Sequence, residues 1–165
     1  MLRLADAKFL AGCSGMVLDY AAREPFWRRG LNYNHGTGHG VGYLGNIHEA
    51  PIGFRWKATR DAMCEIEPGM VITDEPGIYI EGSHGIRIEN ELLVCAGEKN
   101  EYGQFLYFEP LTFVPIDLDA LRPELMTEEE KQLLNAYHQS VYEKISPYLE
   151  AEEKEWLKEY TRPVK

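Results

Sequence analysis

Five histidines occur in this 165-residue chain, and three of them, His35, His39 and His48, lie within a span of fourteen residues. His35 and His39 are four residues apart, a spacing that places two metal ligands on one face of a helix. Glycines at positions 36, 38, 40 and 42 argue against a helix, because each costs about 1 kcal/mol there relative to alanine. They favour extended or looped backbone, to which a ligand or a second strand can approach closely. A flexible loop that happens to contain histidines is the alternative.

Two carboxylates form the second chemical feature. Met70–Glu75 is apolar and β-branched, which predicts a strand ending at Glu75. Gly85–Val94 alternates at first, which predicts a second strand with Arg87 and Glu89 on one face. A hairpin through the intervening turns would place Glu75 beside Glu89. Because adjacent carboxylates repel each other, one retains its proton unless a cation neutralises the pair.

A divalent metal would neutralise this pair, and a histidine from the glycine-rich stretch would complete a mixed nitrogen and oxygen ligand set. Such ligands suit Mn²⁺, Zn²⁺ or Co²⁺, and bridging carboxylates suit hydrolytic sites with two metals. The alternative is a surface hairpin in which Glu89 pairs only with Arg87. Spacing alone does not separate these two interpretations.

The elements that would position these residues are predicted from periodicity and turn signals. Ser14 is suited to cap a helix that runs through Met16 and Ala21, and Pro25 either kinks that helix or opens a second short turn. The polar, mixed segment Phe54–Ile66 is interpreted as a surface loop. The aromatic segment Phe105–Ile116 contains two prolines, which restrict it to an edge or terminal strand. Thr127 begins a capping box before an apolar helical stripe, and a second amphipathic helix follows Pro147. The predicted fold class is α+β, with an antiparallel sheet and a helical C-terminal tail.

Composition narrows the class of protein. The length suits one domain, and 44% hydrophobic residues with 27% charged residues are ordinary for a globular chain. A net charge of −10 speaks against a nucleic-acid binder. No apolar run reaches the roughly 18 residues of a membrane span, and the first residues lack a signal-peptide core, so a cytoplasmic location is expected. Three widely spaced cysteines predict free thiols rather than disulfides.

Four motifs, in order, resemble the Xaa-Pro aminopeptidase (aminopeptidase P) family of pita-bread metallopeptidases. The motifs are Leu31-Asn-Tyr-Asn-His-Gly-Thr-Gly-His-Gly-Val-Gly, Asn46-Ile-His-Glu-Ala-Pro51, Glu67-Pro-Gly-Met-Val-Ile-Thr-Asp-Glu-Pro-Gly77 and Gly85-Ile-Arg-Ile-Glu-Asn90. Leu18–Arg23 and Phe108–Ile116 also fit the pattern, the latter resembling the longer eukaryotic-type branch. The resemblance implies a partial pita-bread fold, with a curved antiparallel sheet, flanking helices and two divalent metal ions, of which manganese is expected.

The resemblance also implies residue roles. His39, Glu75 and Glu89 match metal ligands, Glu75 also activating water and Glu89 bridging both metals. His35 and His48 match histidines that hold the substrate and help to move protons, and Arg87 matches the arginine that orients hydrogen bonds in the site. His84 and His138 match no catalytic position.

The chain departs from the family pattern, which requires five ligands, two of them aspartates upstream of the His motif. None of the aspartates here stands in that context, and Asp74 should point away from the face of Glu75. We therefore expect residues 1–120 to be the C-terminal portion of a catalytic domain, with residues 121–165 as a helical extension. The chain would be the C-terminal catalytic segment of an enzyme that releases the N-terminal residue from peptides with proline second, and inactive when isolated.

Two alternatives remain: a non-catalytic peptide- or protein-binding module, and a prolidase-like dipeptidase. Expected partners are the peptide, the missing N-terminal half of the enzyme and a second copy in a homo-oligomer, a dimer. Neither nucleic acid nor a membrane is expected as a partner.

Overall fold

The structure is a computed structural model that describes all 165 residues. The chain separates into two compact units, Arg3–Leu111 with Met1, and Thr112–Lys165 with Leu2. The helices and strands are α1 Leu2–Ala5, β1 Phe9–Leu10, α2 Gly15–Trp27, β2 Gly38–Gly40, β3 Glu49–Phe54, β4 Val71–Asp74, β5 Gly77–Ile80, β6 His84–Arg87, β7 Asn90–Asn100, β8 Gly103–Pro110, α3 Glu128–Ile145 and α4 Ala151–Tyr160.

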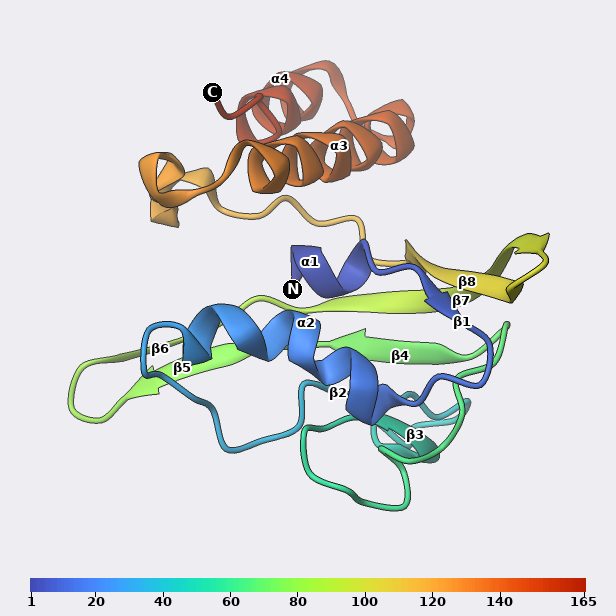
Figure 1. The fold of residues 1–165 in the computed structure, drawn as a ribbon. Coiled ribbons are helices and arrows are strands. Elements are labelled where there is room, and N and C mark those ends of the chain that lie inside the picture. The colour runs from blue at the N-terminus through green and yellow to red at the C-terminus, as the bar shows by residue number, and fades with distance from the viewer. The chain divides into compact units, whose positions relative to one another are not determined.

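The first unit is built on a six-stranded antiparallel sheet in the order β1-β8-β7-β4-β2-β3, from which the β5-β6 hairpin extends (Figure 1). Helix α2 runs along this sheet, and Leu18 and Ala22 on α2 pack into the same buried cluster as Ile72 and Leu92 from β4 and β7. The remaining members of that cluster come from α1 and from the other strands: Leu4, Phe9, Ile52, Phe54, Ile66, Val94, Leu106 and Phe108. An α+β architecture with an antiparallel sheet agrees with the prediction from sequence.

Two element-level predictions were wrong. The segment Gly85–Val94 is not one strand, because the ladder breaks at Ile88 and Glu89 between β6 and β7. Phe54–Ile66 is not a plain surface loop either. Phe54 ends β3 and is 0% exposed, and Ile66 is 1% exposed. Both side chains belong to the buried cluster that residues of α2 and the sheet form. The polar residues between Phe54 and Ile66 make the segment resemble a surface loop in the sequence.

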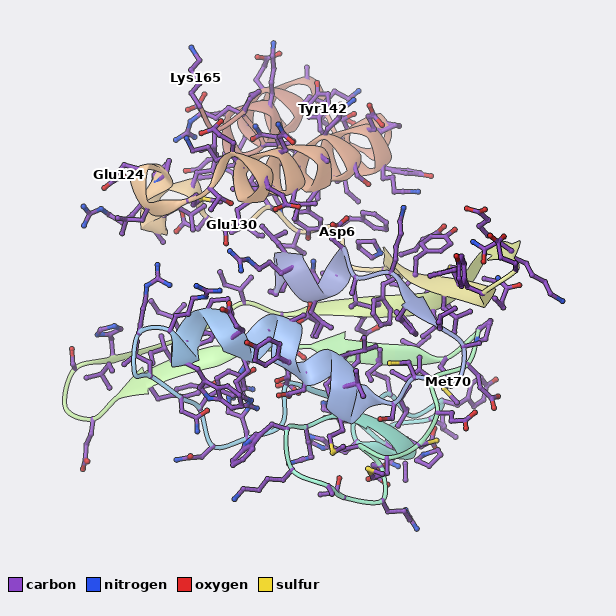
Figure 2. All side chains as sticks on the ribbon, viewed as in Figure 1. Asp6, Met70, Glu124, Glu130, Tyr142 and Lys165 are labelled. Carbon is purple, nitrogen blue, oxygen red and sulfur yellow. The ribbon has the colours of Figure 1, made fainter.

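The second unit contains α3 and α4. As predicted, α3 begins with a capping box, in which Thr127 and Glu130 satisfy each other's backbone N–H groups (Glu130 is labelled in Figure 2). Leu134 and Val141 form its buried stripe, as the periodicity indicated. None of the helices is both long enough and apolar enough to cross a lipid bilayer. The expected boundary between residues 120 and 121 stays a prediction.

Candidate active site

His39 lies at the centre of β2, which runs between β3 and β4 in the sheet. The glycines on either side of it are required by close packing. A Cβ atom on Gly38 would lie 1.8 Å from the carbonyl oxygen of Thr73, and one on Gly40 would lie 2.3 Å from that of Glu49. This segment is therefore a tightly packed strand and not a flexible loop, and it holds His39 at a fixed position.

The register of the sheet places Glu75 opposite Glu89. Asp74 on β4 faces Asn90 on β7, and β5 pairs with β6 in the same register further along. Carried across the break between the two ladders, that register makes Glu75 and Glu89 direct neighbours on adjacent strands. Side chains at such positions share one face, with Cβ atoms about 5 Å apart. The hairpin expected from the sequence thus brings the two carboxylates together.

Glu75 is the most densely contacted of the predicted site residues. Its Oε1 atom lies 3.2 Å from His39 Nε2 and accepts a hydrogen bond of 3.2 Å from the Thr73 hydroxyl. Its Oε2 atom accepts a hydrogen bond of 3.2 Å from Arg87, whose Nε donates to the Tyr79 hydroxyl at 2.7 Å. Glu75 is only 8% exposed. His39 and Thr73 therefore hold Oε1 of Glu75, and Arg87 holds Oε2.

The neighbouring carboxylates have perturbed protonation. Partial burial and the negative charge of Glu75 raise the pKa of Glu89, while Arg87 and His39 act in the opposite direction. Asp74 is completely buried, and neither of its carboxylate oxygens has a hydrogen-bond partner. Burial raises the pKa of Asp74 to about 7. The sheet therefore brings three carboxylates to one region, two of them as a repelling pair.

A small cavity of about 200 Å³ collects most of the predicted site residues. It is lined by His35, Gly36, Gly38, His39, His48, Arg55, Glu75 and Arg87. The ring of His48 lies 4.1 Å from that of His39, between centroids. The Nδ1 atom of His35 lies 2.6 Å from the carbonyl oxygen of Gly36, and its Nε2 atom is buried without a partner.

Five of the six predicted site residues thus line one cavity, and the sixth, Glu89, lies opposite Glu75. The donors suit a divalent metal in kind, since an imidazole nitrogen beside carboxylates is a borderline-hard set. No three His, Cys, Asp or Glu side chains are grouped closely enough to hold a metal ion. That result includes His39, Glu75 and Glu89, whose assignment as metal ligands stays a prediction.

Sequence reasoning missed three residues of the site: Thr73, Tyr79 and Arg55. Tyr79 could have been found, because alternation along the hairpin puts it on the same face as Glu75. Thr73 is also on that face, and it accepts a hydrogen bond of 3.0 Å from the backbone N–H of His39. Arg55 follows β3 and gave no signal, since its place in the cavity depends on contacts across the sheet.

Comparison with known families identifies the class of this protein. The model of "Metallopeptidase family M24" matches residues 1–96, and that of the "C-terminal region of peptidase_M24" matches residues 104–164. The chain therefore belongs to metallopeptidase family M24. As the sequence resemblance implied, it has part of the pita-bread fold of that family.

Its relatives narrow the comparison further. The chain is 44% identical over 172 residues to a Talaromyces marneffei protein named "Probable Xaa-Pro aminopeptidase P", covering 100% of this chain and 26% of that protein. A Coprinopsis cinerea protein of the same name is 42% identical, with coverage of 99% and 27%. The chain thus spans about a quarter of the length of these relatives.

Solved structures of related enzymes agree with the family that the sequence comparisons identify. The crystal structure of a Caenorhabditis elegans X-prolyl aminopeptidase, described as a cytosolic enzyme with a di-nuclear active site, matches with a TM-score of 0.89 and 38% identity over 99% of this chain and 27% of that one. A Bacillus anthracis Xaa-Pro dipeptidase matches less well, with a TM-score of 0.50 and 34% identity over 71% of this chain and 29% of that one. The match is thus more extensive to the aminopeptidase than to this dipeptidase.

Proposed function

We propose that this chain is the C-terminal catalytic segment of a dinuclear-metal aminopeptidase that releases the N-terminal residue from Xaa-Pro peptides. The observation that supports it most directly is the contact of 3.2 Å between His39 and Glu75, with Glu89 opposite Glu75 in the sheet register. We assign His39, Glu75 and Glu89 as metal ligands. Manganese is the proposed metal, and the cytoplasm is the proposed location.

The metal ions and the side chains of the site would have different roles in the reaction. Bound divalent ions would supply Lewis acidity, which lowers the pKa of a water molecule and polarises the scissile carbonyl. Glu75 would accept a proton from the attacking water, and Arg87 fixes the orientation of the Glu75 carboxylate through Oε2. Since Nδ1 of His35 faces a carbonyl oxygen, its proton is assigned to Nδ1, which leaves Nε2 as a hydrogen-bond acceptor for substrate.

We further propose that the isolated chain is inactive, because it lacks the two aspartates that complete the family's ligand set. Asp74 is the aspartate nearest in sequence to a proposed ligand, but it is fully buried. Three ligands hold two ions poorly, since each ion needs several protein donors. The missing half of the domain would supply the remaining ligands.

Exposed apolar side chains beside the site support assembly with another chain or segment. Tyr43, Leu44 and Ile47 follow β2 and are 99%, 88% and 71% exposed. Such a group commonly marks an interaction surface. We propose that the chain associates as a homodimer when its missing half is absent, and a strictly monomeric chain in sedimentation would contradict this.

The test is hydrolysis of Arg-Pro-Pro with added Mn²⁺, by this chain alone, by the parent protein that contains it, and by the chain mixed with the preceding part of the C. elegans enzyme. We expect activity from the parent and none from the chain alone. In the parent, His39→Ala should lower kcat/KM by ~100-fold or more, since loss of a residue that only supports a metal ligand already costs about 10–100-fold. The matched control is His84→Ala, an exposed histidine that does not line the cavity.

An inactive parent would refute the proposed reaction. Cleavage of Xaa-Pro dipeptides with no cleavage of the tripeptide would identify a prolidase-like enzyme instead, and binding without cleavage would identify a non-catalytic module. Tight, stoichiometric binding of two metal ions by the isolated chain would show that the missing aspartates are not needed.

A further inference from the structure

A fully buried ion pair lies outside the cavity and takes no part in the proposed chemistry. Asp19 and Arg23 are one turn apart on α2, both are 0% exposed, and Arg23 Nε donates to Asp19 Oδ2 at 2.8 Å. Apolar residues often replace a buried ion pair without loss of stability, because removing two charges from water is costly. The pair is therefore a poor source of stability for α2 and calls for another explanation.

Apart from a second hydrogen bond to Asp19, of 3.4 Å to Oδ1, Arg23 uses its remaining donors on a single segment, residues 32–37. One terminal nitrogen donates to Asn32 Oδ1 at 2.9 Å and to the carbonyl oxygen of Tyr33 at 2.8 Å. The other donates to the carbonyl oxygen of His35 at 3.3 Å and to Thr37 Oγ1 at 3.4 Å. The guanidinium also lies 3.8 Å from the centre of the Tyr33 ring. One side chain thus fixes the backbone on both sides of His35.

The same network continues to Glu75 through Thr37. The Thr37 hydroxyl donates to Asp19, and the carbonyl oxygen of Thr37 accepts the backbone N–H of Glu75 at 2.7 Å. Thr37 is 0% exposed and directly precedes β2, which contains His39. The segment that Arg23 holds therefore determines the position of His35 and also one backbone hydrogen bond of Glu75.

We propose that Asp19 and Arg23 are positioning residues, which hold residues 33–37 so that His35 and Glu75 face the same cavity. The assignment rests on the proposed function only in treating His35 and Glu75 as site residues. A lysine would not replace Arg23, because its single ammonium cannot span two carbonyl oxygens, a hydroxyl and a carboxylate in fixed directions. Arginine has five donors in a planar arrangement, which matches the contacts observed.

The test uses the 165-residue chain without metal or substrate, so that it does not depend on activity. Arg23→Lys is compared with Leu18→Ala, a core truncation on the same helix that leaves the network unchanged. Two readouts are local: the tautomer of His35 from its ring nitrogen shifts, and the hydrogen exchange of the Glu75 amide. The reference is the Val94 amide, which bonds to the carbonyl oxygen of Met70 in the sheet.

In Arg23→Lys we expect the Glu75 amide to exchange ~10-fold faster relative to Val94, as the loss of about one buried hydrogen bond implies. His35 should change from the Nδ1-protonated form to a mixture of tautomers. In Leu18→Ala both readouts should stay as in the unmodified chain, although its melting temperature falls. Thr37→Val removes only the hydroxyl and should give the same exchange change in a smaller amount, which covers the case that Arg23→Lys does not fold.

Unchanged exchange and an unchanged His35 tautomer in both Arg23→Lys and Thr37→Val would overturn the proposal. Faster exchange of the Glu75 amide relative to Val94, together with a mixture of His35 tautomers, in Leu18→Ala would also overturn it, because the effect would then reflect general loss of stability. An inactive parent enzyme would refute the proposed function and leave these measurements as they are, so the two failures can be told apart.

Discussion

The buried carboxyl of Asp74 should make the first unit less stable as the pH rises. The ordinary pKa of this group is 3.8, and burial raises it to about 7 in the folded chain. A folded-state pKa above the unfolded value gives stability that is fully present below about pH 4 and is lost as pH rises through about 7. A difference of about three pKa units corresponds to about 4 kcal/mol.

Asp74→Asn isolates this contribution. A buried amide without partners costs about as much as a buried neutral carboxyl, so near pH 4.5, slightly above the unfolded pKa, the variant should be more stable than the unmodified chain by only about 1 kcal/mol. Near pH 8 the variant should be more stable by about 4 kcal/mol, because only the unmodified chain must then bury a charge or take up a proton. The difference between the two chains, rather than either curve alone, cancels the titration of Glu89 and of the histidines.

Urea unfolding followed by tryptophan fluorescence measures the difference between pH 4.5 and pH 8. A Trp156→Phe background removes the tryptophan of the second unit and leaves Trp27 and Trp56 to report on the first. Asp6→Asn, an exposed carboxylate in the same unit, is the matched control for loss of one negative charge. A free-energy difference between Asp74→Asn and the unmodified chain that does not vary with pH would refute the reasoning.

Three further predictions concern single residues. Thr127→Ala removes the capping hydroxyl of α3 and should lower the stability of the second unit by about 1 kcal/mol, measured by urea unfolding with Trp156 as the reporter. His138 is fully buried, and burial lowers its pKa from the ordinary value of 6.5. The second unit should therefore lose stability as the pH falls below 6.5, because the unfolded chain then binds a proton more readily than the folded one. In the same assay, His138→Gln should abolish that loss. Gly38→Ala should prevent the fold or lower its stability by about 3 kcal/mol or more, since the new Cβ would lie 1.8 Å from Thr73 O. Gly97→Ala, whose Cβ would lie 3.3 Å from the nearest atom, is the control in a thermal melt and should cost much less.

The sheet and the helical stripes were predictable because each follows from a local period. The strand expected at Met70–Glu75 is β4, Val71–Asp74, and the capping box at Thr127 begins α3 as predicted. The break at Glu89 was not predictable, because Ile88 and Glu89 continue the alternating pattern while the pairing partner changes from β5 to β4. A change of the pairing strand depends on contacts across the whole sheet, so the sequence pattern of a single strand does not reveal it.

The burial of polar side chains was the other feature that the sequence could not predict. Arg23 contacts residues nine to fourteen positions away, and its burial depends on a segment that has no regular structure. A charged residue four positions after Asp19 is equally typical of an exposed helical pair. The spacing therefore predicts that the two interact, but it does not predict that the pair is buried or that it holds the site.

Pro76 ends the ladder between β4 and β7 directly after Glu75, one of the proposed metal ligands. Proline has no backbone N–H, so the ladder that joins β4 to β7 cannot continue unbroken beyond Glu75. Glu75 donates its own N–H to Thr37, on the side of β2, at 2.7 Å, as the alternation of an antiparallel strand directs it. The register is nevertheless conserved from β4 and β7 into β5 and β6, which keeps Glu75 opposite Glu89. Pro76 therefore ends only the bonding toward β7, whereas the bond of Glu75 to Thr37 follows from the alternation of the strand and places Glu75 between β2, which contains His39, and the segment that contains Glu89.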